Sequence, residues 1–455
     1  MDAQPNTLTT PQSPGNGLRL RLATPADADA LAEFNTRVHR EEDEPEEFLS
    51  AWTGDLMSDR HPTTSPADFV LVEDTTAGNK LVATGCLIPQ VWRFDDLLFP
   101  VGRPELIGTH PAYRRRGLAR AVMAAIHQLS AGYGHIAQGI TGIDWFYRQF
   151  GYEYALPLGG GRVLGLGNIP PLKNEAAQPY RLRPAAVADI PALMRLYRHQ
   201  CAGKLVSVVI DRPYWEYNLA GHSPGSAEDR RYFVILNKAE EVVGYYRTPA
   251  RLWGSRLGVR ELTLATGVLW PAALPAVLNA LKAQGEAMSN AEATAGTGNR
   301  PPLTGIRFML GPEHPLYEYL AAKLEPPLPP YAWYIRLPDL HRFLRHISPV
   351  LERRLANSML AGYSGELNMT FYRDGLQLVF EDGALRGIHR WQAPETNEHW
   401  DGAGFPPLVF LQLLFGFRSL AELRQAFPDC WADKTQTLLL NALFPKQASW
   451  VLPLA

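Results

Sequence analysis

Cysteine is scarce in this chain, and no apolar run is long enough to cross a membrane. The three cysteines, Cys86, Cys201 and Cys430, are far apart and fit neither a metal-binding motif nor a disulfide framework. We therefore expect free thiols, no bound metal and a cytoplasmic protein. A membrane-spanning helix needs about 18 or more consecutive apolar residues, and the sequence contains no such stretch.

Excess charge of either sign is also missing. Lys and Arg number 44 and Asp and Glu number 46, which gives a net charge of −2 at pH 7. This near balance offers no electrostatic case for a nucleic-acid partner. Residues 1–17 lack the basic and apolar regions of a signal peptide, and their polar composition predicts a disordered tail. The chain has 455 residues, 46% of them hydrophobic, which suggests about three globular domains.

The segment most informative about function covers residues 106–123. An apolar run ends at a proline, an Arg/Gly-rich turn follows, and an amphipathic helix begins directly after it: Leu106-Ile-Gly-Thr-His-Pro-Ala-Tyr-Arg-Arg-Arg-Gly-Leu-Ala-Arg-Ala-Val-Met123. A helix N-terminus attracts anions through its unpaired backbone amides and its dipole. Gly117 lets the main chain approach a phosphate closely. Arg114, Arg115 and Arg116 add charge-assisted donors. The pattern favours a pyrophosphate site; the alternative is a basic loop capping an ordinary surface helix.

A second motif follows at residues 145–152. A helix is expected over 117–131 and a strand over 136–143, after which the sequence reads Trp145-Phe-Tyr-Arg-Gln-Phe-Gly-Tyr152. Aromatic residues in this arrangement are also typical of a helix end packed on a sheet, with Gly151 as its C-cap. We expect that packing role for Phe146, Phe150 and Tyr152.

The two motifs resemble motifs A and B of the GNAT acetyltransferases. Arg114, Gly117 and Ala119 stand at the Arg/Gln-x-x-Gly-x-Gly/Ala positions, which in that family hold the pyrophosphate of acetyl-CoA. The aromatic motif closes the cofactor cleft there. The resemblance implies acetyl-CoA as the cosubstrate, no metal, and the following cofactor-binding residues: Ile107, Gly108, Thr109, Arg114, Arg115, Arg116, Gly117, Leu118 and Ala119.

An internal echo indicates a duplicated domain. Residues 21–29 and 181–189 share Arg, Leu and Asp at the same relative positions, with an offset of 160. Each copy continues with a predicted hairpin, at 69–88 in the first and at 232–246 in the second. We call the predicted pyrophosphate site at the start of the helix in the first copy the cradle. Residues 262–273 occupy the corresponding place in the second copy, and they contain no Arg-x-x-Gly-x-Ala. One active site per chain is therefore expected, in the first copy.

The C-terminal third changes character. Residues 287–302 are small and polar and predict a loop. Beyond Tyr334 the pattern predicts these elements: a helix at 337–355, strands at 366–371 and 375–381, and helices at 405–415, 419–426 and 435–443. This α+β region resembles the sterol-carrier-protein-like domain.

Two GNAT-like domains followed by such a region are the arrangement of the Eis (enhanced intracellular survival) family. The expected fold is therefore α/β (α+β), with two GNAT-like mixed-sheet domains in tandem and a sterol-carrier-protein-like α+β domain. The expected boundaries are a disordered tail at 1–17, the active GNAT domain at 18–165, a second GNAT-like domain at 178–330, and the last domain at 335–455. The family also implies a homo-oligomer, by resemblance a hexamer.

Acetyl transfer to an amine needs an oxyanion donor, an acid and a base. The strand that runs into the cradle is placed to supply the donor, and Gly108 either marks a bulge there or is a tolerated strand glycine. Resemblance to Eis assigns Tyr147 as the acid, and a tyrosine with an ordinary pKa of about 10 suits a thiolate whose acid has a pKa of about 8.5. The same resemblance assigns the carboxylate of Ala455 as the base. His110 is the alternative base, or else a satisfied loop histidine.

The acceptor is expected to be an amine, either an aminoglycoside-like polyamine or a lysine side chain. Residues 41–47 carry six carboxylates, which form either an acidic mouth that attracts cations or a solvated loop. Trp52, Trp92 and Phe94 are candidates for apolar walls or for core. The rival function is a non-catalytic acyl-CoA sensor or a lipid or ligand carrier led by the C-terminal domain. A third is acetylation of protein N-termini, which requires a narrow peptide groove.

Overall fold

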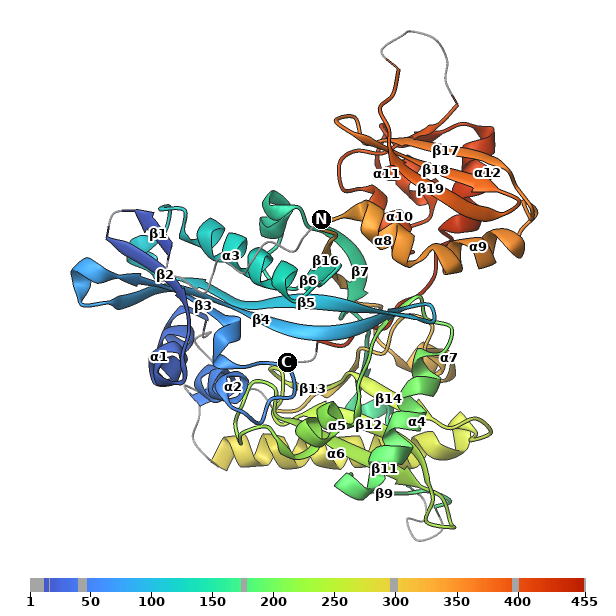
Figure 1. The fold of residues 1–455 in the computed structure, drawn as a ribbon. Coiled ribbons are helices and arrows are strands. Elements are labelled where there is room, and N and C mark those ends of the chain that lie inside the picture. The colour runs from blue at the N-terminus through green and yellow to red at the C-terminus, as the bar shows by residue number, and fades with distance from the viewer. Residues whose placement is uncertain are drawn as a thin grey trace.

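The computed structural model describes residues 12–15, 17–39, 47–172, 178–294, 302–394 and 401–453. Most of the predicted N-terminal tail therefore lies outside the described residues, as do Ala455 and nearly all of the acidic run. The described residues build mixed α/β structure, with a long central sheet flanked by a middle region and a separate C-terminal region (Figure 1). The mixed α/β fold class expected from the sequence is confirmed.

The largest sheet in the described part has nine strands and is called the N-terminal sheet here. Its order is β1-β2-β3-β4-β5-β6-β16-β7, with β10 paired to β4 beside that path. The bounds are Gln12–Gly15 for β1, Leu18–Leu22 for β2, Phe69–Asp74 for β3, Lys80–Phe94 for β4, Leu97–Thr109 for β5, Ala137–Ile140 for β6, Glu153–Leu158 for β7, Val206–Val208 for β10 and Tyr331–Arg336 for β16.

Helices cover both faces of this sheet because its strands alternate between two apolar cores. Helix α3 (Leu118–Gly132) packs on one face, where Val70 and Val72 of β3 join its core. Helices α1 (Ala28–His39) and α2 (Glu47–Met57) pack on the opposite face with Phe69 and Leu71. Neighbouring residues of β3 thus point to opposite cores, as the period of two in a strand requires. The two layers are visible in Figure 1.

Two strands of the N-terminal sheet come from far along the chain. Strand β16 lies between β6 and β7, antiparallel to both, and places Trp333 and Tyr334 in fully buried positions. Strand β10 extends the sheet on the far stretch of β4, where Val206 pairs with Phe94. The N-terminal sheet is therefore completed by β10 and β16, whose residues the sequence analysis assigned to the second domain or placed next to it.

The middle region contains two smaller sheets. One has the order β14-β12-β11-β9 and the other β13-β15-β8. Their bounds are Arg162–Gly165 for β8, Arg181–Pro184 for β9, Arg230–Leu236 for β11, Val242–Pro249 for β12, Arg256–Val259 for β13, Glu261–Leu264 for β14 and Gly305–Phe308 for β15. Strand β8, which the predicted boundary at residue 165 places in the first domain, pairs with β15 of this region.

The helices of the middle region are α4 (Ile190–Cys201), α5 (Arg212–Ala220), α6 (Trp270–Thr294) and α7 (Pro315–Leu320). Helix α6 corrects the predicted loop at 287–302, because the helix continues through Thr294. Its last turns are rich in alanine, the best helix former, and Met288 is buried in the local core. The sequence analysis interpreted these small residues as a loop, whereas in the structure they are helix formers that lie beside a packed face.

The internal echo is present as local structure. Arg21 and Asp27 form a bidentate ion pair at 2.7 and 2.8 Å, and Arg183 and Asp189 form the same pair at 2.8 and 2.6 Å. Each aspartate also accepts the backbone amide that precedes its helix, at 2.8 Å in both copies. The pairs, and the 12-residue helices α1 and α4 that follow them, lie 162 residues apart, so the structural repeat is offset by two residues from the sequence echo. The arginine in each case holds the pKa of its aspartate below the ordinary value.

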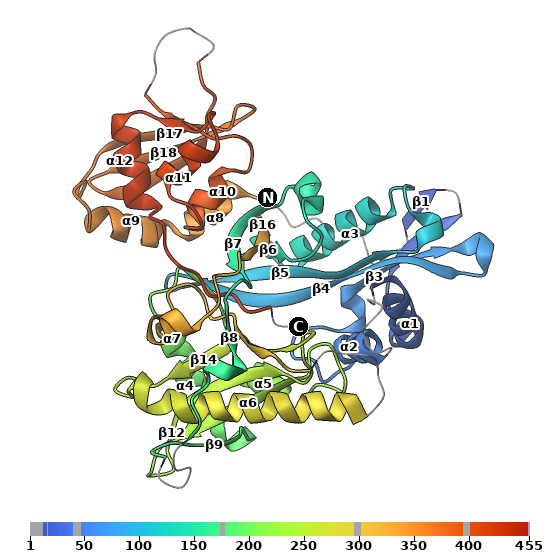
Figure 2. The same ribbon diagram turned by 180° about the vertical axis from the view of Figure 1, so that it is seen from behind.

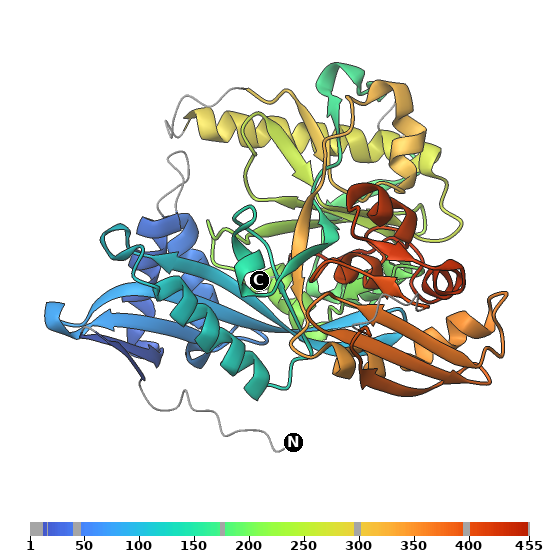
Figure 3. The same ribbon diagram turned by 90° about the horizontal axis from the view of Figure 1, so that it is seen from above.

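The C-terminal region has a five-stranded sheet of order β19-β18-β17-β20-β21. The strands are Gly365–Thr370 (β17), Gly375–Glu381 (β18), Ala384–Arg390 (β19), Ala403–Gly404 (β20) and Trp431–Ala432 (β21). The helices are Leu340–His346 (α8), Ser348–Ala356 (α9), Phe410–Leu414 (α10), Leu420–Ala426 (α11) and Lys434–Leu443 (α12). In Figure 1 this region stands apart from the middle region, and Figure 3, which looks from above, shows it at one end of the central sheet.

Two predicted helices of this region differ from those observed. The helix expected over 337–355 is two helices, which meet at Ile347 because Pro349 lacks the amide that would continue the first. The helix expected over 405–415 is confined to Phe410–Leu414, since Pro406 and Pro407 precede it. The strands predicted around residues 366–381 match β17 and β18 to within one residue.

The last described residues form a strap, residues 446–453, that leaves the C-terminal region and passes between the other two (Figure 2). The amide of Leu205 donates to the carbonyl of Ala448 at 2.8 Å, and the amide of Trp450 donates to Val206 at 2.7 Å. The indole of Trp333 donates to the carbonyl of Val451 at 3.3 Å. The strap thus ties the end of the chain to β10 and β16. No helix in the described part of the chain is both long and apolar enough for a bilayer.

Replacing Trp333 by alanine is expected to destabilise the protein by about 3–5 kcal/mol, as is usual for a large aromatic lost from a core. Trp333 is fully buried, meets Trp92 edge to face at 5.6 Å and lies under the guanidinium of Arg103. Urea unfolding followed by circular dichroism measures the change. Trp145→Ala, at a tryptophan that is 71% exposed, serves as the control and should leave the midpoint nearly unchanged. Equal midpoints for the two variants would contradict the packing argument.

Candidate active site

The site begins where β5 and β6 separate. The two strands are parallel and pair only at Val101–Ala137 and Gly102–Gln138. Beyond that point β6 pairs with β16 through Gln138, Gly139 and Ile140, while β5 continues to Thr109 beside β4 alone. The edge of β5 from Arg103 onward therefore carries backbone groups without a neighbouring strand. Such an edge is available for hydrogen bonds with a ligand.

A bulge lies in this part of β5. Thr84 pairs with Gly108 and Cys86 with Glu105, so that Leu106 and Ile107 together oppose Gly85. Leu106 has a φ of 52°, an unusual conformation for a leucine. Of the two alternatives for Gly108, a bulge or a tolerated strand glycine, the bulge does not hold, because it lies at Leu106 and Ile107 while Gly108 is in a regular pair with Thr84. Beyond it the ladder is regular, and because His110 donates its amide to Val82, alternation directs the amide and carbonyl of Thr109 away from β4.

Gly108 has a different reason to be glycine. A Cβ at this position would lie 2.8 Å from Nε2 of His39 and 3.1 Å from Val38, both at the end of α1. The strand and the helix could not approach so closely with any larger residue. Gly108 is therefore a site of close packing rather than the bulge itself.

The predicted cradle is present at the start of α3. Gly117 is the N-cap with a φ of 79°, and Arg115 is also left-handed with a φ of 64°. The first helical hydrogen bond runs from Ala121 to Gly117, so the three preceding helical amides have no partner within the helix. A Cβ at Gly117 would meet nothing within 4 Å, which shows open space in front of these amides. A cavity of about 530 Å³ lies there.

Most of the predicted cofactor residues line this one cavity. They come from the end of β5 and from the turn and first residues of α3: Ile107, Gly108, Thr109, Arg114, Arg115, Gly117, Leu118 and Ala119. Arg116 does not line the cavity. Its guanidinium lies over the ring of Tyr113 at 4.7 Å, and Tyr113 in turn donates to Asp74 at 2.8 Å. Arg116 thus supports the turn from behind.

A family comparison bears on this geometry directly. Residues 19–155 match the family described as an acetyltransferase (GNAT) domain. This part of the chain is a GNAT domain. The domain makes the protein an acetyltransferase by class, and the matched range contains both motifs and the whole cavity lining. No curated protein matches the chain.

Solved structures share the fold at low sequence identity. A probable N-acyltransferase from Enterococcus faecalis is 13% identical, with a TM-score of 0.63 over 95% of this chain and 98% of that one. A GCN5-related N-acetyltransferase from Anabaena variabilis is 14% identical, with a TM-score of 0.63 over 95% and 99%. Eis1 from Mycobacterium abscessus is 14% identical, with a TM-score of 0.54 over 94% and 98%. The likeness thus extends over nearly the whole chain and is one of fold.

The aromatic motif of the GNAT domain forms the wall opposite the cradle. Residues Phe146–Phe150 make one short 3₁₀ helix, which Gly151 ends with a φ of 85°, as predicted for its C-cap. Phe146 and Phe150, expected to be packing residues, line the cavity together with Gln149. Tyr152 is fully buried, as expected. The spacing of the aromatic residues did not distinguish those that line the cavity from the one that is buried in the core.

Tyr147, the predicted acid, sits one layer behind this wall. Its side chain is 4% exposed and its ring meets Tyr334 and Tyr152 edge to face at 5.5 and 6.2 Å. Tyr147 is not among the residues that line the cavity, and a Cβ at Gly142 would lie 3.8 Å from its hydroxyl. Burial raises the pKa of Tyr147, and Glu105 and Tyr334 add to the rise. The hydroxyl therefore stays protonated at physiological pH and is able to donate.

His39 is the residue that sequence reasoning missed. It ends α1, lines the cavity, and its Nε2 has no hydrogen-bond partner among the described residues. Burial lowers the pKa of His39, and a hydrogen bond with the backbone of Leu106 opposes the shift. Because Nε2 is unpartnered, we assign the bond with Leu106 to Nδ1, and Nε2 then lies buried against Gly108 with no hydrogen-bond partner among the described residues. The only signal in the sequence that could have indicated His39 was Gly108, because a glycine at that position leaves room for the imidazole ring.

The other predicted participants fall elsewhere. His110 accepts a hydrogen bond from the amide of Ala112 at 3.2 Å and does not line the cavity. Of the two alternatives for His110, this is the satisfied loop histidine. Trp52, Trp92 and Phe94 belong to the cores rather than to the cavity lining. Ala455 and residues 41–46 lie outside the described residues, and only Glu47 of the acidic run is seen.

Gly117→Asp is expected to weaken acetyl-CoA binding at least a hundredfold, about 3 kcal/mol, because a carboxylate would occupy the space in front of the helix amides. Calorimetric titration measures the affinity. Gly134→Asp is the matched control, since Gly134 follows the same helix, has a φ of 74° and also faces open space. Similar affinities for both variants would overturn the cradle.

Proposed function

We propose that this protein transfers an acetyl group from acetyl-CoA to an amine by direct attack. One observation carries the proposal: a single cavity joins the unpaired edge of β5 to the free amides and arginines at the start of α3. The first feature suits the pantetheine arm and thioester, and the second suits the pyrophosphate. Amine acetylation is the reaction that a GNAT domain with this arrangement supports.

The reaction requires few groups. The amine nitrogen attacks the thioester carbonyl carbon, and the developing oxyanion needs a backbone donor at the end of β5, either in the bulge at Ile107 or at Thr109, whose amide faces away from β4. As the tetrahedral intermediate collapses, the carbon–sulfur bond breaks and the thiolate takes a proton. Tyr147, kept protonated by burial, supplies it. The acetylated amine gives up its proton to a base.

Two groups compete for the role of base. His39 lines the cavity with a free Nε2 and is neutral near pH 7, because burial lowers its pKa below 6.5. The carboxylate of Ala455, assigned by family resemblance, is the other. We favour His39 because it lines the cavity at the end of β5, in contact range of Gly108.

The amine is proposed to be a small polyamine of the aminoglycoside type or a lysine side chain, and the acidic residues 41–47 support a cationic acceptor by steering. We further propose one active site per chain, within residues 18–165. The region 178–330 would be a GNAT-like scaffold without a cradle, followed by a sterol-carrier-protein-like domain at 335–455. Assembly into a homo-oligomer, a hexamer by resemblance, belongs to the same proposal.

Tyr147→Phe is expected to lower turnover about 10²–10⁴-fold while acetyl-CoA affinity stays unchanged, because only the proton donor is lost. Released thiol is measured with aminoglycosides, polyamines and lysine peptides as acceptors. Tyr152→Phe, another buried tyrosine of the same ring cluster, controls for packing. Tight acetyl-CoA binding with no turnover on any amine, in the wild type, would favour the acyl-CoA sensor or carrier instead.

His39→Gln is expected to lower kcat/KM and to remove the acid limb of its pH profile. The limb lies below pH 6.5, because the base acts only when neutral and burial lowers its pKa. His110→Gln should retain both the rate and the limb. If His39→Gln behaves like wild type while deletion of residues 454–455 abolishes turnover, the base is the terminal carboxylate.

A further inference from the structure

A second cavity, of about 290 Å³, lies between the start of α2 and the middle region. Its walls come from the loop before β11, from the ends of β11 and β12, and from β13 with the residue after it. It shares no lining residue with the acetyl-CoA cavity. Five arginines line it against three carboxylates: Arg230, Arg231, Arg247, Arg251 and Arg260, with Glu47, Glu228 and Asp229. We call it the arginine cavity.

Arg247 is the most deeply buried of these arginines. Its side chain is 1% exposed, and its Nε pairs with Glu261 at 2.7 Å. Its two terminal nitrogens are buried and make no hydrogen bond of good geometry with a described residue, although Tyr232 interacts with the guanidinium and, with Glu261, raises its pKa. A hydrogen bond left unmade at a buried polar group is unfavourable, and more so at a charged one. The guanidinium therefore presents a free face inside the protein.

Arg230 adds a second such group. Its side chain is 9% exposed, it pairs with Glu228, and its Nη2 donates to the carbonyl of Pro453 at 2.8 Å. Its Nη1 is buried with no partner. The nearest carboxylate is thus already engaged, and one donor of the guanidinium remains unused.

Arg260 completes the group. Within the described chain its guanidinium has no ion pair or hydrogen bond, and it lies over the ring of Trp253 at 4.8 Å. Burial, together with the charges of Arg247, Arg307 and Arg103, lowers the pKa of Arg260 to about 9. The side chain is still charged near neutral pH but is repelled by its neighbours. A bound negative charge would relieve that repulsion.

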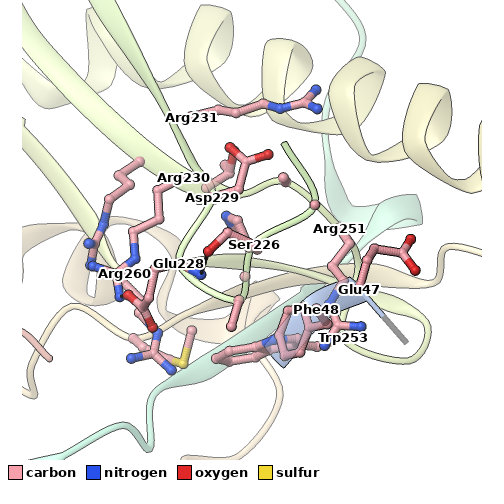
Figure 4. Close-up of a pocket in the computed structure, with 18 residues that line it drawn as sticks. Glu47, Phe48, Ser226, Glu228, Asp229, Arg230, Arg231, Arg251, Trp253 and Arg260 are labelled. Atoms are coloured by element: carbon pink, nitrogen blue, oxygen red, sulfur yellow. Dashed lines mark hydrogen bonds and ion pairs between the residues drawn. The ribbon is translucent and has the colours of Figure 1, made fainter. Parts of the chain in front are cut away.

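Figure 4 shows how the walls differ. Arg230 and Arg260 lie side by side at one end, while Phe48 and Trp253 form an aromatic surface at the other. The guanidinium of Arg251 covers the ring of Phe48 at 3.6 Å. Arg231 extends away from the group toward α6, and it is exposed. The cavity therefore combines a positive end with an apolar face.

We infer that the arginine cavity binds a small anion, a carboxylate or phosphate group, held by Arg230, Arg247 and Arg260. Guanidinium groups match both oxyanions in geometry and charge, with two parallel donors for two oxygens. Phe48 and Trp253 would contact the non-polar part of the same ligand. Water could satisfy the free donors but would leave the charge of Arg260, which has no ion pair among the described residues, uncompensated. This site goes beyond the proposed acetyl transfer, because the acetyl-CoA cavity does not include it.

Calorimetric titration of the full chain with citrate and with inorganic phosphate at low ionic strength tests the site. The wild type should show one saturable site, Arg260→Gln should weaken it at least tenfold, and Arg260→Lys, which keeps the charge but loses the paired donors, should fall between. Arg231→Gln is the matched control and should retain wild-type affinity. Acetyl-CoA affinity should be the same in all four proteins, which shows that each is folded.

Absence of a saturable heat in the wild type, or equal losses in Arg231→Gln and Arg260→Gln, overturns the site. A gain of tenfold or more on deleting residues 454–455 also overturns it, since the occupant would then be the chain's own terminal carboxylate. If citrate binds and competes with the amine, the site is supported, and the bound anion is then an acidic group of the acceptor. Binding without competition supports a separate ligand. Binding with no acetyl transfer on any amine supports the site while the proposed function fails.

Discussion

The hydrogen bonding of β16 determines much of this molecule. Strand β6 has two edges, and from Gln138 to Ile140 one of them is taken by β16. On its other edge β6 pairs with β5 at only two positions, and the edge of β5 beyond Gly102 has no neighbouring strand. The cofactor cavity occupies that opening, with the start of α3 at one side and the short helix at 146–150 at the other. A strand encoded some 200 residues later thus holds the catalytic sheet apart.

Arginine serves three physical purposes here. Arg21 and Arg183 pair with an aspartate at the same point of the repeated unit and fix the entry into a helix. Arg116 stacks on Tyr113 and supports the cofactor turn. Arg247 and Arg260 have donors that no described side chain satisfies. Only the last use leaves donors without an acceptor among the described residues, which is why it indicates a ligand and the other two do not.

The parts that sequence reasoning could predict are those made by contiguous residues. The cradle is one strand, one turn and one helix, so its glycine and arginines were readable from spacing, and all but Arg116 line the cavity. What the sequence could not show depends on distant contacts. His39 meets Gly108 only because α1 packs across β5, and the arginine cavity forms from α2 and four separate segments of the middle region. The sequence left the role of Gly108 open because a glycine signals close packing as readily as a bulge.

The position of β16 and of the strap also sets the order in which the protein is completed during synthesis. Until residue 336 has left the ribosome, β6 and β7 lack the strand that separates them, and each presents an unpaired edge. Trp333 gains the carbonyl of Val451 only when translation is almost finished. A nascent chain that already contains every residue lining the cavity is therefore still open along its sheet. Shielding of those edges until β16 has been made becomes a requirement of the fold itself.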